Sequence, residues 1–395
     1  MRALRGRIGR LLRATPILAE AHAGVRAWQT RSDYRDLVRR YAGRPDTLPA
    51  LPACELGHPP RVLFIGTDEE QDRSGFIQAL ERCSQLTLFR HESGRYGHND
   101  PRAPEVRRAA NARQLDATLD AMAAAGGLPQ IVIAQTWATL IDPAAFDRAR
   151  ARGCMVINIA MDDRHQFRGR RESCGWSGTL ALIGHIDLAL TAAPECVAWY
   201  QAEGCPALYF PEASDPDIFH PRPELPRIHD VSFIGGRYGI REQIVRTLRR
   251  AGVKVSAWGN GWEGGRIDVP GMARVFAQSR VILGVGTIGH CRDFYALKLR
   301  DFDAPMTGSC YLTHDNPDLR SLYDVGREIV TYRSTDDCVD QVRALLADPA
   351  RAESIGQAGR IRAQRDHTWA RRFSDLFSRI SRPATPVPTR EVAAP

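Results

Sequence analysis

The chain has 395 residues, 43% of them hydrophobic and 25% charged, which is typical of soluble globular proteins and excludes a disordered chain. Its length favours two domains over one. The formal net charge of +8 suits an anionic partner such as a membrane surface, a nucleic acid or a phosphorylated small molecule. No nucleic-acid-binding motif accompanies this charge, so a nucleic-acid partner is not expected.

Residues 1–58 are predicted to form a basic helical extension. Met1–Arg13 holds five arginines, and its apolar residues recur at the spacing of one helical face. Such a helix either docks on the protein itself or lies on an anionic membrane surface. The segment lacks the apolar run of a signal peptide, and the longest apolar stretch, residues 178–193, is too short to span a bilayer. We expect a cytoplasmic protein, with peripheral contact to the inner face of the membrane through residues 1–13 as an open alternative.

The nine cysteines are scattered, odd in number and without a Cys-x-x-Cys pair. This pattern disfavours both a disulfide framework and a zinc site. Cys154 and Cys310 open apolar runs, where a free cysteine behaves as a small buried hydrophobe. Cysteine usage therefore fits a reducing compartment.

A first lobe is predicted over residues 59–226. Short β-branched runs alternate there with longer segments of helical period, which is typical of βαβ units around a parallel sheet. The predicted strands are Arg61–Ile65, Leu86–Phe89, Ile131–Ala134, Met155–Ile159, Leu188–Thr191 and Ala207–Phe210. The predicted helices are Ser74–Cys83, Glu105–Ala124, Pro143–Arg152 and Pro194–Glu203.

Residues 211–226 contain five prolines and little periodicity, which predicts a connection between lobes. Alternation restarts in a second lobe, residues 227–381. Its predicted strands are Val231–Ile234, Val253–Ala257, Val281–Val285, Cys310–Thr313 and Ile329–Tyr332. Its predicted helices are Ile240–Ala251, Gly271–Ser279, Phe294–Ala304 and three consecutive helices over residues 336–380, with breaks near Pro349 and His367. Residues 382–395, rich in proline and alanine, are expected to be disordered.

These elements predict an α/β fold of two doubly wound, Rossmann-like lobes that face each other across a cleft. Ligands of open α/β sheets bind beyond the carboxyl ends of the strands, so functional residues are expected in the loops that follow strands. Residues 235–241, Gly-Gly-Arg-Tyr-Gly-Ile-Arg, follow one strand and open a helix. Gly235 and Gly236 allow close backbone approach, and Arg237 or Arg241 can grip a phosphate, although such turns also serve packing alone.

A second candidate cluster spans residues 298–309 and leads into the strand Cys310–Thr313. Lys298 and Arg300 do not share one helical face, but either can reach the cleft from the start of the helix. Asp303 can accept hydrogen bonds from a ribose diol. The alternative interpretation is a solvated charged face whose Asp–Arg pairs contribute under about 1 kcal/mol each.

Several motifs occur in a characteristic order between Asp230 and Phe377. They are residues 231–235 with 237–239 and Arg241, residues 258–262 (Trp-Gly-Asn-Gly-Trp), residues 298–305 (Lys-Leu-Arg-Asp-Phe-Asp-Ala-Pro), Gly308, residues 311–313, 326–329 and 367–369. In this order they resemble the C-terminal lobe of the CgeB-type, spore-protein-like glycosyltransferases of the GT-B superfamily. Residues 158–163, Asp187 and residues 211–219 resemble first-lobe segments of the same family.

The resemblance implies a GT-B fold in which the C-terminal helices return to the first lobe and the second lobe binds a nucleotide-diphosphate sugar. It implies that Arg237 or Arg241, with Lys298 or Arg300, holds the diphosphate. Asp303 stands where relatives usually carry a glutamate that holds the ribose, and the shorter side chain favours a water-bridged contact. Tyr295 stands where the wider group often has a glutamate near the donor sugar, and no catalytic role is transferred to it.

Asp162 and Asp163 follow the strand Met155–Ile159 and are the catalytic candidates of the first lobe, together with His290 of the second. The two aspartates can orient an acceptor hydroxyl or act as a base, but adjacent aspartates after a strand also suit a turn or a helix N-cap. His290 follows a glycine-rich loop, where a structural histidine is the alternative. Metal ligation by the aspartates would need further oxygen ligands that the sequence does not identify, so no metal site is predicted.

The predicted function is transfer of a sugar, by a hexosyltransferase-like enzyme, from a UDP- or GDP-linked donor to an acceptor glycan, lipid or protein. Retention follows from the resemblance. Independence of metal ions is expected because arginine, lysine and helix N–H groups can stabilise the departing diphosphate without a metal. No cofactor is predicted. One alternative is a GT-B-like epimerase or phosphorylase. Another is a binding or assembly protein of cell-surface or spore-coat biogenesis that has lost turnover, which Tyr295 and Asp303 keep open. Nucleic-acid binding is the weakest alternative.

Overall fold

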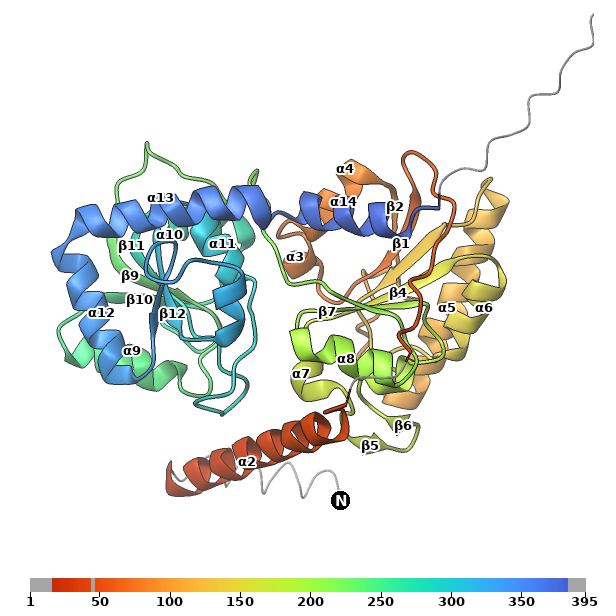
Figure 1. Cartoon of the computed structure of the whole chain (residues 1–395), viewed down its shortest axis with the longest axis horizontal. Helices are drawn as coiled ribbons and strands as arrows, with labels where there is room; N and C mark the ends of the chain where they lie inside the picture. The colour runs from red at the N-terminus through yellow and green to blue at the C-terminus, as the bar shows by residue number, and fades with distance from the viewer. Residues whose placement is uncertain (1–15, 44–46, 383–395) are drawn as a thin grey trace, which may run out of the picture.

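The computed structural model describes residues 16–43 and 47–382, and it contains two α/β lobes that lie side by side (Figure 1). In lobe 1, six parallel strands form a sheet in the order β2-β1-β3-β4-β7-β8. These strands are β1 (Arg61–Ile65), β2 (Gln85–Leu88), β3 (Ile131–Ala134), β4 (Met155–Ala160), β7 (Leu188–Thr191) and β8 (Ala207–Tyr209). Each agrees with a predicted strand to within one residue at either end, which confirms the doubly wound interpretation of lobe 1.

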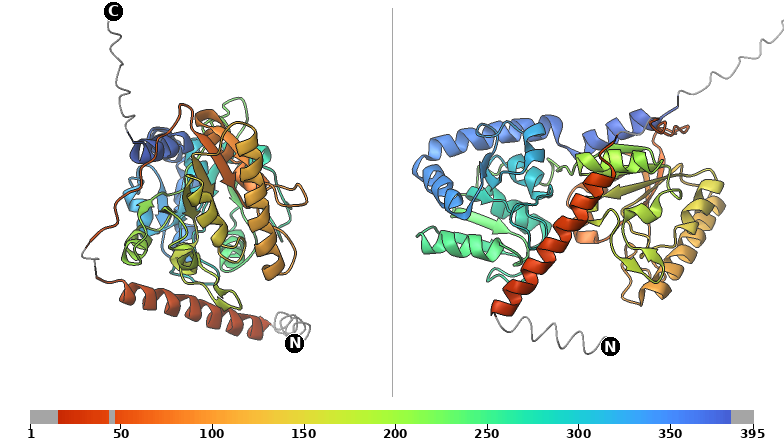
Figure 2. Two further views of the ribbon diagram at one scale, coloured as in Figure 1. Left: turned by 90° about the vertical axis from the view of Figure 1, so that its right-hand side faces the viewer. Right: turned by 60° about the horizontal axis from the view of Figure 1, so that its bottom comes forward.

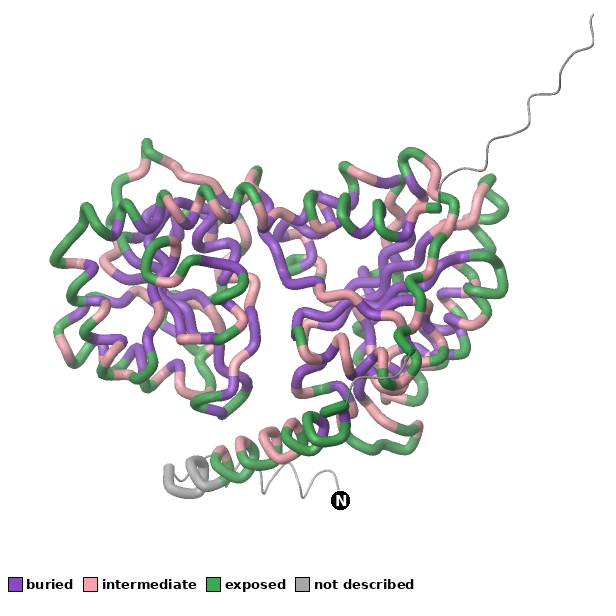
Figure 3. Tube along the Cα trace, viewed as in Figure 1, coloured by how far each residue is buried: buried purple, intermediate pink, exposed green. Residues whose placement is uncertain are grey.

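Helices cover both faces of this sheet. They are α3 (Glu69–Asp72), α4 (Phe76–Cys83), α5 (Pro104–Ala124), α6 (Ala144–Ala151), α7 (Asp163–Gln166) and α8 (Pro194–Ala202). Successive strand residues alternate between two cores: Val62 and Phe64 face the core beneath α4, whereas Leu63 and Ile65 face the core beneath α5 and α6. Because both faces are buried, the strands read as continuous apolar runs, which made them easy to predict. Figure 3 shows these strands as buried.

Lobe 2 repeats this arrangement around five parallel strands in the order β10-β9-β11-β12-β13. They are β9 (His229–Ile234), β10 (Val255–Trp258), β11 (Ser279–Leu283), β12 (Cys310–His314) and β13 (Val330–Tyr332). The covering helices are α9 (Arg241–Arg250), α10 (Val269–Ala277), α11 (Arg300–Met306), α12 (Thr335–Ala347) and α13 (Pro349–Asp366). Both lobes therefore have the predicted doubly wound architecture.

One predicted helix of lobe 2 was placed wrongly. The helix expected over Phe294–Ala304 begins only at Arg300. Residues before it are extended, because Tyr295 pairs with Thr287 in an isolated bridge and the Ala296 N–H donates to the Gly286 carbonyl at 3.0 Å. Helices α3 and α7, the hairpin of β5 (Arg171–Glu172) and β6 (Gly175–Trp176), and the short 3-10 turns η1 (Thr179–Leu182) and η2 (Pro317–Ser321) were not predicted.

The last helix, α14 (Trp369–Ile380), leaves lobe 2 and packs on lobe 1, as the resemblance implied (Figure 1). The rings of Trp369 and Phe373 lie 4.9 and 5.0 Å from the ring of Phe76 in α4. The chain therefore crosses between the lobes twice, and the crossings meet. The Ser214 N–H donates to the His367 carbonyl at 3.0 Å, and the Trp369 N–H donates to the Ser214 carbonyl at 3.1 Å.

The predicted N-terminal helical extension contains α2 (Pro16–Arg40), which lies across both lobes (Figure 2, right). The Tyr34 hydroxyl donates to Glu195 of lobe 1 at 3.0 Å, and the Tyr34 ring lies 4.6 Å from the ring of Phe294 in lobe 2. The basic segment 1–13 and residues 383–395 of the predicted tail lie outside the described residues. None of the helices described is both long and apolar enough to cross a bilayer.

Candidate active site between the lobes

A cavity of about 530 Å³ opens between the two lobes, at the carboxyl ends of their strands. Lobe 2 contributes Gly235 and Gly236 after β9, Gly259 and Asn260 after β10, and Lys298 and Arg300 near the start of α11. Lobe 1 contributes Gln135 after β3, Asp162 after β4 and side chains around α3. The predicted post-strand loops of both lobes therefore meet in one cleft.

The glycine turn after β9 is shaped by its neighbours. Gly235 has a φ of 154°, its carbonyl accepts a hydrogen bond from the Trp262 indole at 2.8 Å, and its N–H donates to the Trp258 carbonyl at 2.8 Å. A Cβ at Gly235 would lie 2.7 Å from a terminal nitrogen of Arg300 and 3.3 Å from one of Arg241. Glycine is therefore required here for the backbone to pass close to both guanidinium groups.

Arg300 lines this wall, and Arg241 lies behind it, next to the glycine turn. Arg300 donates to the Ile234 carbonyl, while its other terminal nitrogen, Nη1, is buried without a hydrogen-bond partner. The Arg241 guanidinium lies 4.1 Å from the centre of the Tyr238 ring and donates to the Gly236 carbonyl at 3.2 Å. Burial and the nearby Arg300 lower the pKa of Arg241 to about 10, so the group stays charged at neutral pH. No described carboxylate forms an ion pair with either arginine.

Lys298 lies on the same wall and reaches across the cleft, with Nζ 3.9 Å from Oδ1 of Asp162. Its backbone N–H donates to the buried Asp301 carboxylate at 2.8 Å, which fixes the turn into α11. Asp303 also lines the cavity, is only 1% exposed, and has one carboxylate oxygen, Oδ1, without a partner. Burial raises the pKa of Asp303 well above its ordinary value.

Four predicted residues do not line the cavity: Arg241, which lies behind the glycine turn, and Arg237, His290 and Asp163, which lie farther away. Arg237 is paired with Glu242 at 2.6 Å and lies over the Trp262 ring, on the outer side of the turn. His290 is exposed and lines a separate cavity between α2 and lobe 2. Asp163 is fully buried beside Thr191 in lobe 1, and burial raises its pKa to about 7. Of the adjacent aspartates, the structure brings only Asp162 to the cleft.

Two important residues had no signal in the sequence. Glu212 lies on the connection just after β8, lines the cavity, and has a carboxylate oxygen, Oε2, that is buried without a partner. Arg164 in α7 joins the lobes, because its guanidinium donates to Glu195 of lobe 1 at 2.7 and 2.8 Å and to Asp318 of lobe 2 at 2.7 Å. Both owe their position to contacts between distant segments, which no local pattern encodes.

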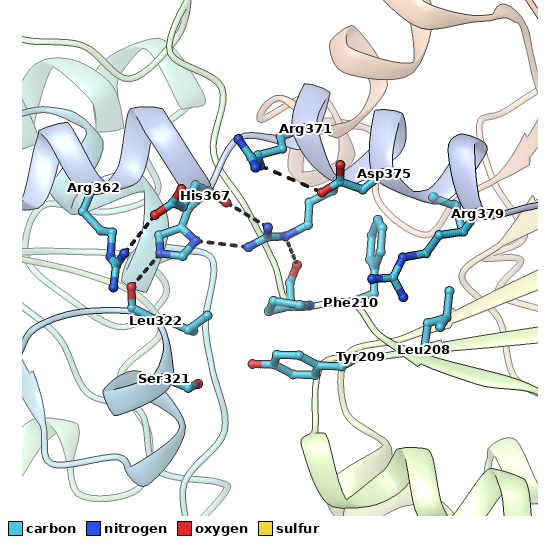
Figure 4. Close-up of a pocket in the computed structure, with 14 residues that line it drawn as sticks. Leu208, Tyr209, Phe210, Ser321, Leu322, Arg362, His367, Arg371, Asp375 and Arg379 are labelled. Carbon is cyan, nitrogen blue, oxygen red and sulfur yellow. Dashed lines mark hydrogen bonds and ion pairs between the residues drawn. The ribbon is translucent and has the colours of Figure 1, made fainter.

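A further cavity, of about 390 Å³, lies where α13 turns into α14 (Figure 4). His367 donates from Nε2 to the Leu322 carbonyl at 2.9 Å and accepts from Arg372 at Nδ1, and burial lowers its pKa to about 4. Arg362 is paired with Asp366 at 2.9 Å. The central polar groups of this cavity are hydrogen-bonded to one another or to the backbone, so His367 has an architectural role at the start of the final helix.

Comparison with known proteins supports this description of the fold. Residues 240–378 match a family model described as glycosyl transferase-like. Sucrose-phosphate synthase from Thermosynechococcus elongatus superposes with a TM-score of 0.58 at 12% identity, covering 80% of this chain and 98% of that one. Anabaena HepE in complex with UDP and glucose gives 0.56 at 10% identity, covering 81% and 99%. A search of curated proteins found no match to this sequence.

A third solved structure, TarM, gives a TM-score of 0.51 at 8% identity and covers 69% of this chain and 58% of that one. At such low identities these likenesses establish the fold alone. The more specific CgeB-type resemblance is not confirmed by the family model that matches. The chain thus has a GT-B fold, and the lobe that holds Arg300 and Arg241 is similar to glycosyl transferase-like proteins.

Proposed function

We propose that this protein transfers a hexosyl group from a nucleotide-diphosphate sugar to an acceptor glycan, lipid or protein. One observation carries the proposal: two guanidinium groups without described carboxylate partners meet a glycine turn at the carboxyl end of β9, and one of them, Arg300, lines the interlobe cavity. Like charges held together in a partly buried site favour a dianionic ligand that offsets their repulsion. A diphosphate has that charge.

In this proposal Arg300 and Lys298 contact the diphosphate, and Arg241 supports it from behind the turn. During transfer the bond between the sugar and the diphosphate breaks and its electron pair leaves with the phosphate oxygen. The acceptor oxygen forms the new bond to the sugar carbon, and its proton passes to the departing phosphate oxygen. Fixed cations stabilise the charge that develops on the leaving group, and this requires no reorganisation during the reaction. Asp303 is placed to hold the ribose, directly or through water.

Retention at the sugar carbon, use of UDP or GDP and independence of metal ions are the finer parts of the proposal. The HepE structures contain UDP or UDP-glucose, which favours UDP among the donor nucleotides. Within residues 16–43 and 47–382, no group of three or more histidine, cysteine or carboxylate side chains is arranged to hold a metal ion. The basic residues of lobe 2 can balance the diphosphate charge by themselves.

The test is thermal melting of the protein with UDP-, GDP-, ADP- and dTDP-sugars, for the wild type and Arg300→Ala. A nucleotide at about a hundred times its Kd stabilises the folded state by about 2.7 kcal/mol, and we expect one nucleotide class to do so. Arg300→Ala should abolish that shift and lower the rate of sugar transfer about a hundred- to a thousandfold.

Arg250→Ala is the matched control, because Arg250 is an exposed arginine of the same lobe, away from the cleft. It should melt with the same nucleotide shift as the wild type. Equal shifts in Arg300→Ala and the wild type would contradict the proposed donor site. The absence of any shift with a folded wild-type protein would favour a binding or assembly protein instead.

A further inference from the structure

The interlobe cavity has basic side chains on one wall only, whereas five of its six lining carboxylates lie on lobe 1 or on the connection and the sixth, Asp303, lies on lobe 2. Among the described lining residues, the basic side chains all come from lobe 2: Arg266, Lys298 and Arg300. The charged side chains that lobe 1 contributes are all acidic: Asp68, Glu70, Asp72 and Asp162. An anionic group is therefore attracted to the lobe 2 wall and repelled by the wall that faces it.

Most of the lobe 1 carboxylates already have partners within the protein. Asp72 accepts from the Thr67 N–H at 2.9 Å and from the Tyr96 hydroxyl at 2.8 Å, and Asp68 caps α3. Glu70 is paired with Arg266 across the cleft at 3.3 Å. Asp162 is different, because its side chain is half exposed and, among the described residues, it forms an ion pair only with Lys298, at the long distance of 3.9 Å. Asp162 is thus available to a ligand.

Glu212 provides a second, independent observation. It lines the cavity where the chain passes from lobe 1 to lobe 2, it is only 5% exposed, and its Oε2 atom lacks a hydrogen-bond partner. Leaving a buried carboxyl oxygen unpaired is costly, so this oxygen favours a hydrogen bond to a ligand or to a bound water. The positive charge of Lys298 lowers the pKa of Glu212, whereas the negative charges of Asp301 and Asp162 raise it. The negative charge of Glu212 in turn raises the pKa of Asp303.

Apolar side chains complete this end of the cavity. Phe76, Met161 and Trp369 line it beside the carboxylates. A sugar ring presents apolar C–H faces as well as hydroxyl groups, so it can contact both kinds of surface. Phosphate, sulfate or carboxylate groups would instead place a negative charge against Asp162 and Glu212.

We propose that the lobe 1 side of the cleft is an acceptor subsite for an uncharged sugar, in which Glu212 and Asp162 bind hydroxyl groups and exclude anionic acceptors. This inference rests on the proposed transfer function and narrows its acceptor to neutral carbohydrate. In this proposal Glu212 binds and orients the acceptor, and Asp162 lies nearer Lys298, which belongs to the donor side of the cleft. Burial raises the pKa of Glu212 to about 7, so near neutral pH it can donate or accept a hydrogen bond.

The experiment measures binding of methyl hexosides, the corresponding methyl hexuronides and hexose 6-phosphates to the full chain by ligand-observed NMR. At least one neutral hexoside should bind, and its anionic counterparts should bind at least tenfold more weakly. Glu212→Ala should weaken binding of the neutral sugar at least tenfold. Glu212→Gln should restore most of it, because an amide keeps the hydrogen-bonding capacity. Glu224→Ala, an exposed glutamate of the same connection, is the matched control and should have no effect.

Nucleotide affinity, measured on the same samples, separates the two proposals. Loss of sugar binding with unchanged nucleotide affinity in Glu212→Ala supports the acceptor subsite. An anionic sugar that binds as tightly as its neutral counterpart, or no sugar binding at all, overturns the inference even where the nucleotide still binds. Should Glu212→Ala fail to fold, Asp162→Asn decides the question, because it should reduce the discrimination against anionic sugars. Unchanged discrimination would contradict the proposal.

Discussion

The two lobes have the same architecture but bring different chemistry to the cleft. In lobe 2, a glycine turn and two arginines leave cationic groups without carboxylate partners. In lobe 1, the charged side chains that line the cavity are carboxylates. Asp72, for example, accepts hydrogen bonds from a backbone N–H and from a tyrosine hydroxyl. The comparison teaches that a doubly wound sheet fixes where a site lies, whereas a few residues after its strands decide which charge the site accepts.

Lobe 1 also differs from lobe 2 because the last helix of the chain, α14, packs on it. Trp369→Ala removes a central side chain of this packing and should cause the largest loss of stability. The indole is 2% exposed and contacts Phe76 in α4. Removing a buried tryptophan typically costs about 3–5 kcal/mol. Calorimetry should show the loss in a transition assigned to lobe 1. Ile361→Ala, at an exposed position of α13, should leave the melting curve nearly unchanged, and equal losses in both variants would contradict the assignment.

Two buried titratable groups, one in each lobe, should change the stability with pH in opposite directions. The pKa of Asp163 in lobe 1 is raised from 3.8 to about 7, so the folded state holds a proton that the unfolded chain has lost, and stability falls as pH rises between these values. The pKa of His314 in lobe 2 is lowered from 6.5 to about 4, so stability falls as pH drops through that range. The expected sizes are about 4 and about 3 kcal/mol.

Denaturant titrations from pH 4 to pH 8 would measure both effects as differences from the wild type. Asp163→Asn should gain relative stability toward high pH, and His314→Gln should gain it toward low pH. Parallel curves for a variant and the wild type would mean that the group titrates alike in the folded and unfolded states.

Gly235→Ala tests the donor wall alone and should have the smallest effect on the free-energy scale. Its added Cβ would push Arg300 away from the turn, and nucleotide affinity should fall about a hundredfold, which corresponds to about 2.7 kcal/mol. Gly252→Ala is the matched control, because Gly252 also has positive φ but has open space around its Cα. If both variants lost nucleotide affinity equally, backbone strain rather than displacement of Arg300 would be the cause.

Much of this fold could be predicted from the sequence because the strands of both lobes are buried on two faces. Lys298, Arg300 and Gly235 were found as candidates because each lies close to the end of a strand or the start of a helix. The spacing in the sequence did not show which of Arg237 and Arg241 lies nearer the cleft. The structure separates them by their partners, because Arg237 pairs with Glu242 and Arg241 lies over the Tyr238 ring. Glu212 was missed because a proline-rich connection has no periodicity from which to infer burial.

The double crossing between the lobes has a consequence for dissecting the protein. A fragment cut at the proline-rich connection would carry α14 without its binding surface, exposing the apolar face formed by Trp369, Phe373, Leu376, Phe377 and Ile380. The complementary fragment would leave Phe76 uncovered. Lobe 1 is not one uninterrupted stretch of sequence, because α14 follows lobe 2 in the chain. A circular permutation that joins α14 directly to the start of β1 is therefore the natural way to produce lobe 1 as an independent unit.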